Sequence, residues 1–289
     1  MATSHVKYFL GTINSTTIND QIEISKQNYD FSYKVLNDFI DLINDEKLFR
    51  VVELNYEELQ SKISYYTSKA KENQNTGLTD SDTIFIDVNR LLLNLLSTIR
   101  TFLDHKETTL KRKFGKESDE FLYFEKETNI AFDENFEYRF IYKLRNYAQH
   151  CGLPAGPPET KSYMNAKSEV QNDFNIYFDR NKLLSDFDWS IQVKKDLAKQ
   201  PEKFNVLPII DKVHELLNSI NIKINDRVLE NYKAEGETLL NLIKRTVGFV
   251  GMPCLMKREG IGTMTYHINW FPLEHISKVT GTQINIKYI

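Results

Sequence analysis

Apolar residues recur at three- and four-residue steps along most of this chain, which is the spacing that gathers them on one face of an α-helix. The clearest helix begins near residue 81, where Asp80 or Ser81 can cap the first turn by accepting a hydrogen bond from a free backbone N–H group. Its apolar stripe consists of Ile84, Val88, Leu91, Leu95, Ile99 and Phe102. The same spacing predicts helices within residues 31–42, 59–66, 136–147, 193–200, 207–220 and 228–247. We therefore predict a mainly α-helical protein.

Three shorter segments carry the patterns of β-strands, which are alternation of apolar and polar residues or enrichment in β-branched and aromatic residues. The first runs from Val6 to Ile13, and the second covers residues 174–178 and predicts one side of a small hairpin. The tail from Met252 to Ile289 is the third, and it predicts a few strands with one short helix after Pro272. The strands are therefore expected as additions to a helical core.

Polar stretches divide the chain into three expected parts. Residues 71–81 are polar with a glycine near their centre, which is typical of a linker or loop. A mostly helical N-terminal segment, residues 1–77, is expected to precede a helical core, residues 78–247. An insertion at about 153–190 carries the expected hairpin, and residues 248–289 form a strand-rich C-terminal region.

Composition and charge place the chain among ordinary globular proteins. Of its 289 residues 41% are hydrophobic and 27% are charged, so a sizeable core can form. The formal net charge of −3 provides no overall basic field for gripping long duplexes of nucleic acid. No apolar run is long enough to cross a membrane, and residues 1–7 lack the pattern of a signal peptide. Cys151 and Cys254 have neither disulfide-framework nor metal-ligand spacing. We therefore expect a soluble, cytoplasmic protein without a metal or other cofactor.

The helix within residues 136–147 runs into the sequence Arg145-Asn146-Tyr147-Ala148-Gln149-His150, which contains two side chains suited to phosphodiester chemistry. Arginine binds a phosphoryl group through two parallel hydrogen bonds, and histidine exchanges protons near neutral pH. Gly152 and Pro154 follow, so His150 is expected in the last turn of the helix. Residues five apart on a regular helix point about 140° apart, so a distorted helix end or a second copy is needed to bring both groups to one phosphate.

The helix that begins near residue 81 also has a polar stripe. Its members are Arg90, Asn94, Ser97, Thr101 and His105. A solvated helix face usually favours Glu and Lys, and this one is nearly free of both, which indicates contact with another polar surface. An exposed face without a function is the alternative. The basic residues that follow, between Lys106 and Lys116, are expected to form a loop.

The run from Arg145 to His150 resembles the signature of the HEPN superfamily, in which an arginine, a polar residue and a later histidine stand near the end of a helix in an α-helical bundle. The preceding long helix is similar to the partner helix of several bacterial branches, on the basis of Asn89, Arg90, Asn94 and the segment 100–105. The resemblance covers about residues 81–247 and is specific at the motif. It implies a mainly α fold, namely a HEPN-like helical bundle with an inserted β-hairpin and a small strand-containing C-terminal region.

This resemblance implies a metal-independent endoribonuclease, of a kind that often acts in phage defence or as a toxin, with an active site formed across a homodimer. Arg145 then stabilises the phosphate, His150 moves the proton and Asn146 positions them, while attack by the RNA 2′-hydroxyl leaves a 2′,3′-cyclic phosphate. The first candidates for contacts with the RNA backbone are Lys111, Arg112 and Lys113. Besides RNA and a second copy, a regulatory partner or trigger is expected. Gly152 stands where members silenced by nucleotide transfer carry a tyrosine, so that inactivation is not expected.

Other interpretations stay open. The same bundle could bind RNA, a nucleotide or a partner protein without cleaving it, or a structural protein could dimerise through the polar stripe around Asn94. Arg145 could instead pair with a carboxylate, with His150 donating to a carbonyl at the helix end.

Smaller features are expected to have structural roles. The tail histidines His267 and His275 match no metal-binding spacing. Cys151 continues an apolar stripe and is expected to pack.

Overall fold

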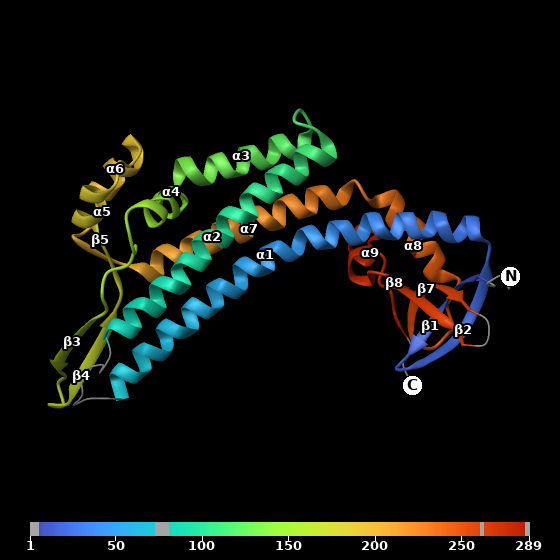
Figure 1. The fold of residues 1–289 in the computed structure, drawn as a ribbon, viewed down its shortest axis with the longest axis horizontal. Coiled ribbons are helices and arrows are strands. Elements are labelled where there is room, and N and C mark those ends of the chain that lie inside the picture. Colours follow the sequence, from blue (N-terminus) through green and yellow to red (C-terminus); the bar gives the residue numbers. More distant parts are fainter. Residues whose placement is uncertain (1–5, 73–80, 261–262, 287–289) are drawn as a thin grey trace. The chain divides into compact units, whose positions relative to one another are not determined.

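The computed structural model describes residues 6–72, 81–260 and 263–286 (Figure 1). The fold is mainly α-helical, as predicted, and the strands of these residues belong to small antiparallel sheets. Within the described ranges no helix is both long enough and apolar enough to cross a membrane. The polar segment expected between the first helices lies largely in residues 73–80, outside the described ranges.

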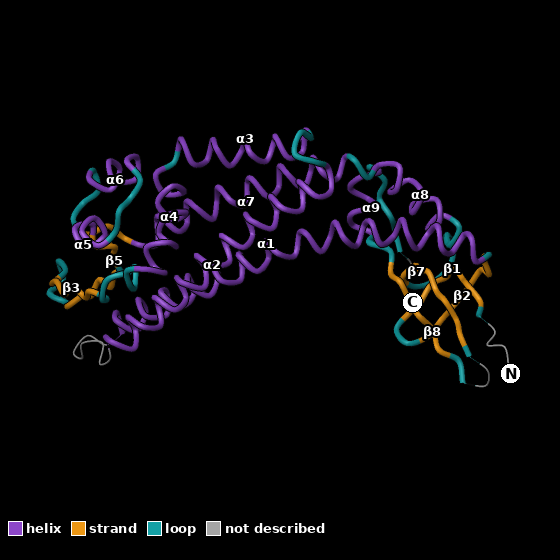
Figure 2. The backbone as a smooth tube through the Cα atoms, turned by 45° about the horizontal axis from the view of Figure 1, so that its top comes forward, coloured by secondary structure: helices purple, strands orange, loops and turns teal. Residues whose placement is uncertain are grey.

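The chain forms two compact units, and the long helices α1 (Lys26–Glu72) and α7 (Val206–Glu230) contribute residues to both. The first unit comprises Met1–Glu46 and Asn225–Ile289, and the second comprises Lys47–Ile224. Figure 2 shows the described strands of the first unit gathered in one curled sheet, whereas the second unit consists chiefly of helices.

The sheet of the first unit has the strand order β2-β1-β7-β8, and all neighbouring strands are antiparallel. The strands are β1 (Lys7–Asn14), β2 (Thr17–Ile24), β7 (Met252–Glu259) and β8 (Thr265–Trp270). Two helices complete this unit, α8 (Lys233–Lys244) and α9 (Leu273–Thr280). One face of the sheet buries a small core made of Phe9, Ile13, Cys254 and Met256.

Most helices and strands of this unit were predicted from the sequence. The strand at residues 6–13, the strands of the tail and the short helix after Pro272 all occur. Strand β2 was not predicted. Asn and Asp are unfavourable in strands, and Asn19 and Asp20 interrupt the alternation of this segment.

The two compact units divide the chain at other places than the expected ranges 1–77, 78–247 and 248–289. The difference arises because β1 pairs with β7, so that Lys7 lies opposite Arg258. The first strand of the chain and the strands of the tail therefore belong to one sheet.

The second unit is a helical bundle in which α2 (Ser81–Phe114) runs beside α1 and α7 and also packs against the two helices that follow it (Figure 1). These two helices are α3 (Asp119–Glu134) and α4 (Phe136–His150), and the unit also contains α5 (Arg180–Asp186) and α6 (Ile191–Ala198). The predicted apolar stripe of α2 is buried from Ile84 to Phe102, which confirms the helix and the face that it presents to the core.

The basic residues between Lys106 and Lys116 do not form the predicted loop, because α2 continues to Phe114. Leu110 extends the buried stripe, and Lys and Arg are good helix formers, so the sequence offers no reason for the helix to end earlier. The helix ends at Gly115, whose φ of 97° favours glycine.

The insertion after α4 contains the predicted hairpin, formed by β3 (Glu159–Met164) and β4 (Val170–Asn175). The single strand predicted over residues 174–178 is wrong, because β4 ends at Asn175 and the next residues start β5 (Tyr177–Asp179), which pairs with β6 (Lys203–Asn205). The Asn172 amide donates to the Ala70 carbonyl at 2.9 Å and thereby ties the hairpin to the end of α1.

Candidate functional site

The candidate site lies at the C-terminal end of α4, and the sequence of this helix sets its position. Phe140, Leu144 and Tyr147 form a buried stripe that holds the helix against the bundle. The chain turns away at Gly152, whose φ of 147° is rarely adopted by other residues. His150 therefore stands in the last turn of α4, as predicted.

Arg145 and His150 have different environments on this helix. Arg145 is half-buried, and its Nε atom is buried without a hydrogen-bond partner in the described part of the chain. Asn146 and His150 are exposed. On a regular helix Asn146 and His150 point within about 40° of each other, whereas Arg145 and His150 point about 140° apart. One chain therefore brings Asn146 and His150 to one face and directs Arg145 away from it.

A second arginine approaches α4 from α2. The Arg100 guanidinium donates to the Tyr142 hydroxyl, and its central carbon lies 4.9 Å from the centroid of the Tyr142 ring. Its Nε atom also donates to Asp104 at 2.8 Å. The Lys143 ammonium lies 5.6 Å from the centroid of the same ring. Tyr142 precedes Arg145 by three positions, so their side chains are neighbours on the helix surface, and Tyr142 brings two cationic groups to this part of α4, of which Arg100 is paired with Asp104.

Arg139, earlier on α4, is fully occupied. Its Nη2 and Nε atoms donate to Asp196 of α6 at 2.7 and 3.2 Å, and its Nη1 atom donates to the Asp133 carbonyl at 2.7 Å. Both partners of the ion pair are buried, with 5% and 7% of Arg139 and Asp196 exposed. Burial raises the pKa of the Asp196 carboxyl, but the hydrogen bonds and charge of Arg139 outweigh burial, so the pKa lies below its ordinary value. This arginine is an anchor of the fold.

Asn89 of α2 fixes the segment that follows His150. Its Nδ2 atom donates to the Ala155 carbonyl at 3.2 Å, and its Oδ1 atom accepts the Ala155 backbone N–H at 2.9 Å. Asn89 is buried, so these bonds satisfy polar groups that water does not reach. The resemblance singled out Asn89, but its partner could not be predicted.

The polar stripe of α2 is exposed in this chain. The side chains are those of Arg90, Asn94, Ser97, Thr101 and His105. Near its start Arg90 donates to Asp87 at 2.8 Å. Burial raises the pKa of Asp87, but hydrogen bonds from Arg90, Tyr66 and Lys62 outweigh burial and lower the pKa to about 2.

The three basic residues expected to meet an RNA backbone lie on the last turns of α2 and do not form one surface. Lys111 pairs with Glu107, and its ammonium lies 4.8 Å from the centroid of the Phe121 ring. Arg112 and Lys113 are exposed. Successive residues of a helix point about 100° apart, so these side chains diverge.

The prediction that Cys151 packs is wrong, since this residue is exposed. The helix ends at His150, so the next side chain no longer follows the helical spacing. In the tail, His275 Nε2 lies 2.9 Å from Glu46. No cluster of three or more His, Cys, Asp or Glu side chains suited to a metal ion occurs in the ranges that the structure describes.

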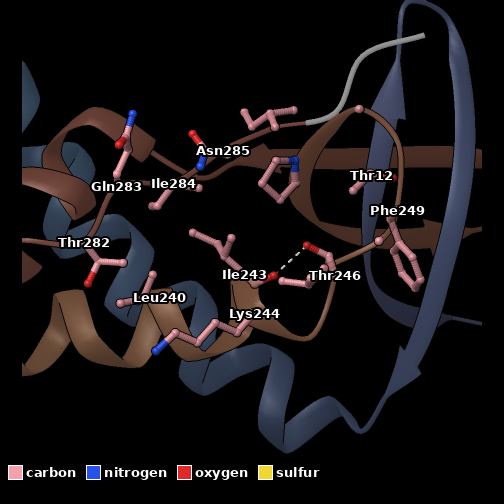
Figure 3. Close-up of a pocket in the computed structure, with 15 residues that line it drawn as sticks. Thr12, Leu240, Ile243, Lys244, Thr246, Phe249, Thr282, Gln283, Ile284 and Asn285 are labelled. Carbon is pink, nitrogen blue, oxygen red and sulfur yellow. Dashed lines mark hydrogen bonds between the residues drawn. The ribbon is translucent and has the colours of Figure 1, made fainter.

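Two cavities of the first unit were not predicted, because segments distant in sequence line them. One of about 250 Å³ lies between α8 and residues 282–286 (Figure 3). Its lining is largely apolar, and the Thr246 hydroxyl is already bonded to the Ile243 carbonyl at 2.7 Å. The other, of about 590 Å³, is called the tyrosine pocket here, and its lining includes Tyr8, Lys26, Tyr29, Tyr33 and Lys257.

No protein-family model, curated protein or solved structure matches this chain. The candidates that its own geometry supplies are Arg145, Asn146 and His150 at the end of α4, with Arg100 and Asn89 from α2.

Proposed function

We propose that this protein is a metal-independent endoribonuclease with a HEPN-like helical bundle. The observation that carries the proposal is the Arg145 side chain, whose buried Nε atom has no partner in the described chain and which stands on the same helix end as the exposed His150. A buried donor without a partner costs about 1–3 kcal/mol. Such a group in a folded protein calls for an explanation, and a phosphate oxygen supplied by a ligand is one.

The two side chains suit the three requirements of RNA cleavage without a metal. The 2′-hydroxyl loses a proton and attacks the phosphorus, negative charge develops on the phosphorane oxygens, and the leaving 5′-oxygen gains a proton. Imidazole can move either proton near neutral pH, which is the role of His150. The Arg145 guanidinium stabilises the developing charge, and Asn146, on the same face as His150, orients the phosphate. The products are a 2′,3′-cyclic phosphate and a 5′-hydroxyl.

The proposal includes a homodimer, because Arg145 and His150 of one chain point about 140° apart on a regular helix. A second α4 helix can supply the missing group. The exposed polar stripe of α2, which lies on a helix packed against α4, supports a polar contact between two copies at this place.

The remaining parts of the proposal concern partners and setting. Arg100 and Lys143 add positive charge beside Arg145, and Arg112 and Lys113 are exposed on the same helix as Arg100. These groups would attract an RNA backbone. A role in phage defence or as a toxin, action in the cytoplasm and control by a partner or trigger belong to the same proposal.

The test is incubation of the purified protein with a mixed RNA pool in EDTA. The Arg145→Ala/His150→Ala variant tests the site, and Arg245→Ala serves as a control because Arg245 is another arginine near the end of a helix, in the unit that does not carry Arg145 and His150. We expect the wild type and the control to cut RNA and leave 2′,3′-cyclic phosphate ends, which mass spectrometry detects. Equal cleavage by the double variant would contradict the assigned roles. Binding of RNA without cleavage by any of the proteins would favour a non-catalytic RNA-binding module.

Mixing the two single variants tests the shared site. A heterodimer of Arg145→Ala and His150→Ala regains one intact site only if the arginine and histidine come from different chains. After subunit exchange we expect about a quarter of the wild-type rate, since about half of the dimers are mixed and each has one of two sites intact. No recovery, with exchange verified, would contradict a site that joins the two chains in this way.

A further inference from the structure

The tyrosine pocket of the first unit differs from the other cavities in its chemistry. Its lining comes from β1, the start of α1, β7 and β8, and it combines three tyrosines with lysine, histidine, aspartate and asparagine side chains. Its volume of about 590 Å³ lies within the usual range of small-molecule sites. The cavity in Figure 3, in contrast, is largely apolar.

The three tyrosines form a continuous aromatic array. The ring centroids of Tyr8 and Tyr29 are 4.7 Å apart, and those of Tyr29 and Tyr33 are 5.8 Å apart with the rings only 7° from parallel. Tyr29 is buried, whereas 39% of Tyr33 is exposed. The outer ring therefore packs against a buried ring and leaves part of its surface accessible to a flat ligand.

The polar groups of the pocket stand around this array. The Lys257 ammonium pairs with Glu259, which fixes it at the rim, and the Lys26 side chain is exposed at the start of α1. Asp30 offers a carboxylate, and Asn269 donates to the Tyr29 hydroxyl at 3.4 Å. Asp30 is the carboxylate of the lining, while Glu259 outside the lining pairs with Lys257 and lies 3.6 Å from His267, which also lines the pocket. The pocket is therefore not a strong anion site. Affinity must come mainly from ring stacking and hydrogen bonds, with a smaller contribution from charge.

A nucleobase fits this combination better than other common ligands. Its faces stack on tyrosine, its edge carries donors and acceptors that suit Asp30 and Asn269, and an attached phosphate can reach a lysine at the rim. A simple sugar phosphate would leave the aromatic array unused, and an aliphatic ligand would leave the charged and amide groups unpaired.

We infer that the tyrosine pocket binds a nucleobase, stacked on Tyr33, from either a free nucleotide or a single-stranded RNA. The inference does not depend on the proposed ribonuclease activity. If both hold, the pocket is a second nucleic-acid contact in the unit that does not carry Arg145 and His150.

The test is calorimetric titration of the full chain with AMP, GMP, CMP and UMP, with ribose 5-phosphate as the ligand that lacks a base. A short 2′-O-methyl oligonucleotide, which cannot be cleaved through its 2′ position, represents the RNA source. Tyr33→Ala removes the stacking platform. Tyr65→Ala is the matched control, because Tyr65 is another α1 tyrosine, with 52% of its surface exposed, in the other unit.

We expect at least one mononucleotide or the oligonucleotide to bind, ribose 5-phosphate to bind far more weakly, and Tyr33→Ala to weaken binding at least about fivefold while Tyr65→Ala does not. Saturation by a mononucleotide identifies a free nucleotide as the ligand, and binding of the oligonucleotide alone identifies RNA. Lys26→Met should weaken nucleotide binding by about threefold and leave nucleoside binding unchanged, since an exposed charge contributes little. Absence of binding by all these ligands, equal binding of ribose 5-phosphate, or full affinity in Tyr33→Ala would overturn the inference.

The same titration of the Arg145→Ala/His150→Ala variant separates this inference from the proposed function. Unchanged affinity in that variant supports an independent pocket. Loss of affinity there would place the ligand at α4 and overturn the inference.

Discussion

The two arginines of α4 lie six positions apart and have opposite surroundings. Arg139 near the start of the helix donates to a buried carboxylate and to a backbone carbonyl at 2.7 Å each. Arg145 near its end is half-buried, and its buried Nε atom has no partner in the described chain. Arginine therefore anchors the fold at one end of this helix and has an unpaired buried donor at the other end.

Under the proposed function, this difference separates a structural charge from one that binds a ligand. A buried charge whose hydrogen bonds are all made inside the chain has nothing left to offer a ligand. A guanidinium with an unused donor adds little to stability, because its desolvation is not compensated within the chain. The proposed function supplies a partner for this donor, namely a phosphate bound at the end of α4 beside the exposed His150.

The largest effect on stability is expected from Asp196→Ala. The substitution leaves the Arg139 charge buried without its carboxylate, and breaking a buried pair in this way typically costs about 3–5 kcal/mol. Urea denaturation followed by circular dichroism measures the change in the free energy of unfolding.

The matched control is Arg139→Met combined with Asp196→Leu. Replacing both charges with apolar residues of similar size removes the uncompensated charge, so most of the lost stability should return. A single Asp196→Ala variant as stable as the wild type would show that Arg139 has another acceptor, and the contrast with Arg145 would fail.

A smaller loss is expected from Asn89→Ala, which tests a neutral anchor beside the site. The substitution leaves the buried N–H and carbonyl groups of Ala155 without partners, and two such groups cost about 2–3 kcal/mol together. The segment after His150 should also exchange its amide hydrogens faster. Unchanged exchange at residues 151–156 would mean that other contacts hold this segment.

Acid provides a further test of the satisfied charges. Asp87 has a pKa near 2 in the folded chain against an ordinary value of 3.8, and its side chain is 18% exposed. The folded chain thus favours the deprotonated form, so this stabilisation is present above about pH 4 and is lost as the pH falls towards 2, in total about 2 kcal/mol. Asp196 contributes in the same direction. Asp87→Asn should reduce the slope of stability against pH below 4, and an unchanged slope would assign the acid sensitivity to other groups.

The sequence predicted those features that neighbouring residues determine. Gly152 and Pro154 end α4 locally, and the spacing from Ile84 to Phe102 defines the buried face of α2 without reference to any other segment. The position of His150 in the last turn followed for the same reason. The basic loop was predicted wrongly because charged residues alone do not end a helix whose apolar stripe continues through Leu110.

The partners of these residues could not be predicted. Arg139 and Asp196 are separated by 57 positions and Asn89 and Ala155 by 66, and periodicity contains no information about which residue a side chain will meet. The pairing of β1 with β7 is another contact of this kind. The motif identified Arg145 as a candidate, but only its surroundings in the fold distinguish it from Arg139.

The smallest effect on stability, and the sharpest test of the comparison, is expected from Arg145→Met. Methionine keeps an unbranched apolar stem and removes the donor that has no partner, so the free energy of unfolding should change by less than about 0.5 kcal/mol or rise slightly. Arg139→Met should lower it by several kcal/mol, because Asp196 then loses its buried cationic partner and keeps only longer contacts with Gln192 and the exposed Lys199. The rate of RNA cleavage should follow the opposite order. Arg145→Met should lower the rate about 100-fold or more, as when one hydrogen-bond donor to a developing oxyanion is removed. Arg139→Met should keep the wild-type rate at temperatures where it is folded. If Arg145→Met were as destabilising as Arg139→Met, Arg145 would have a structural partner in solution, and its unused donor would no longer indicate a phosphate site.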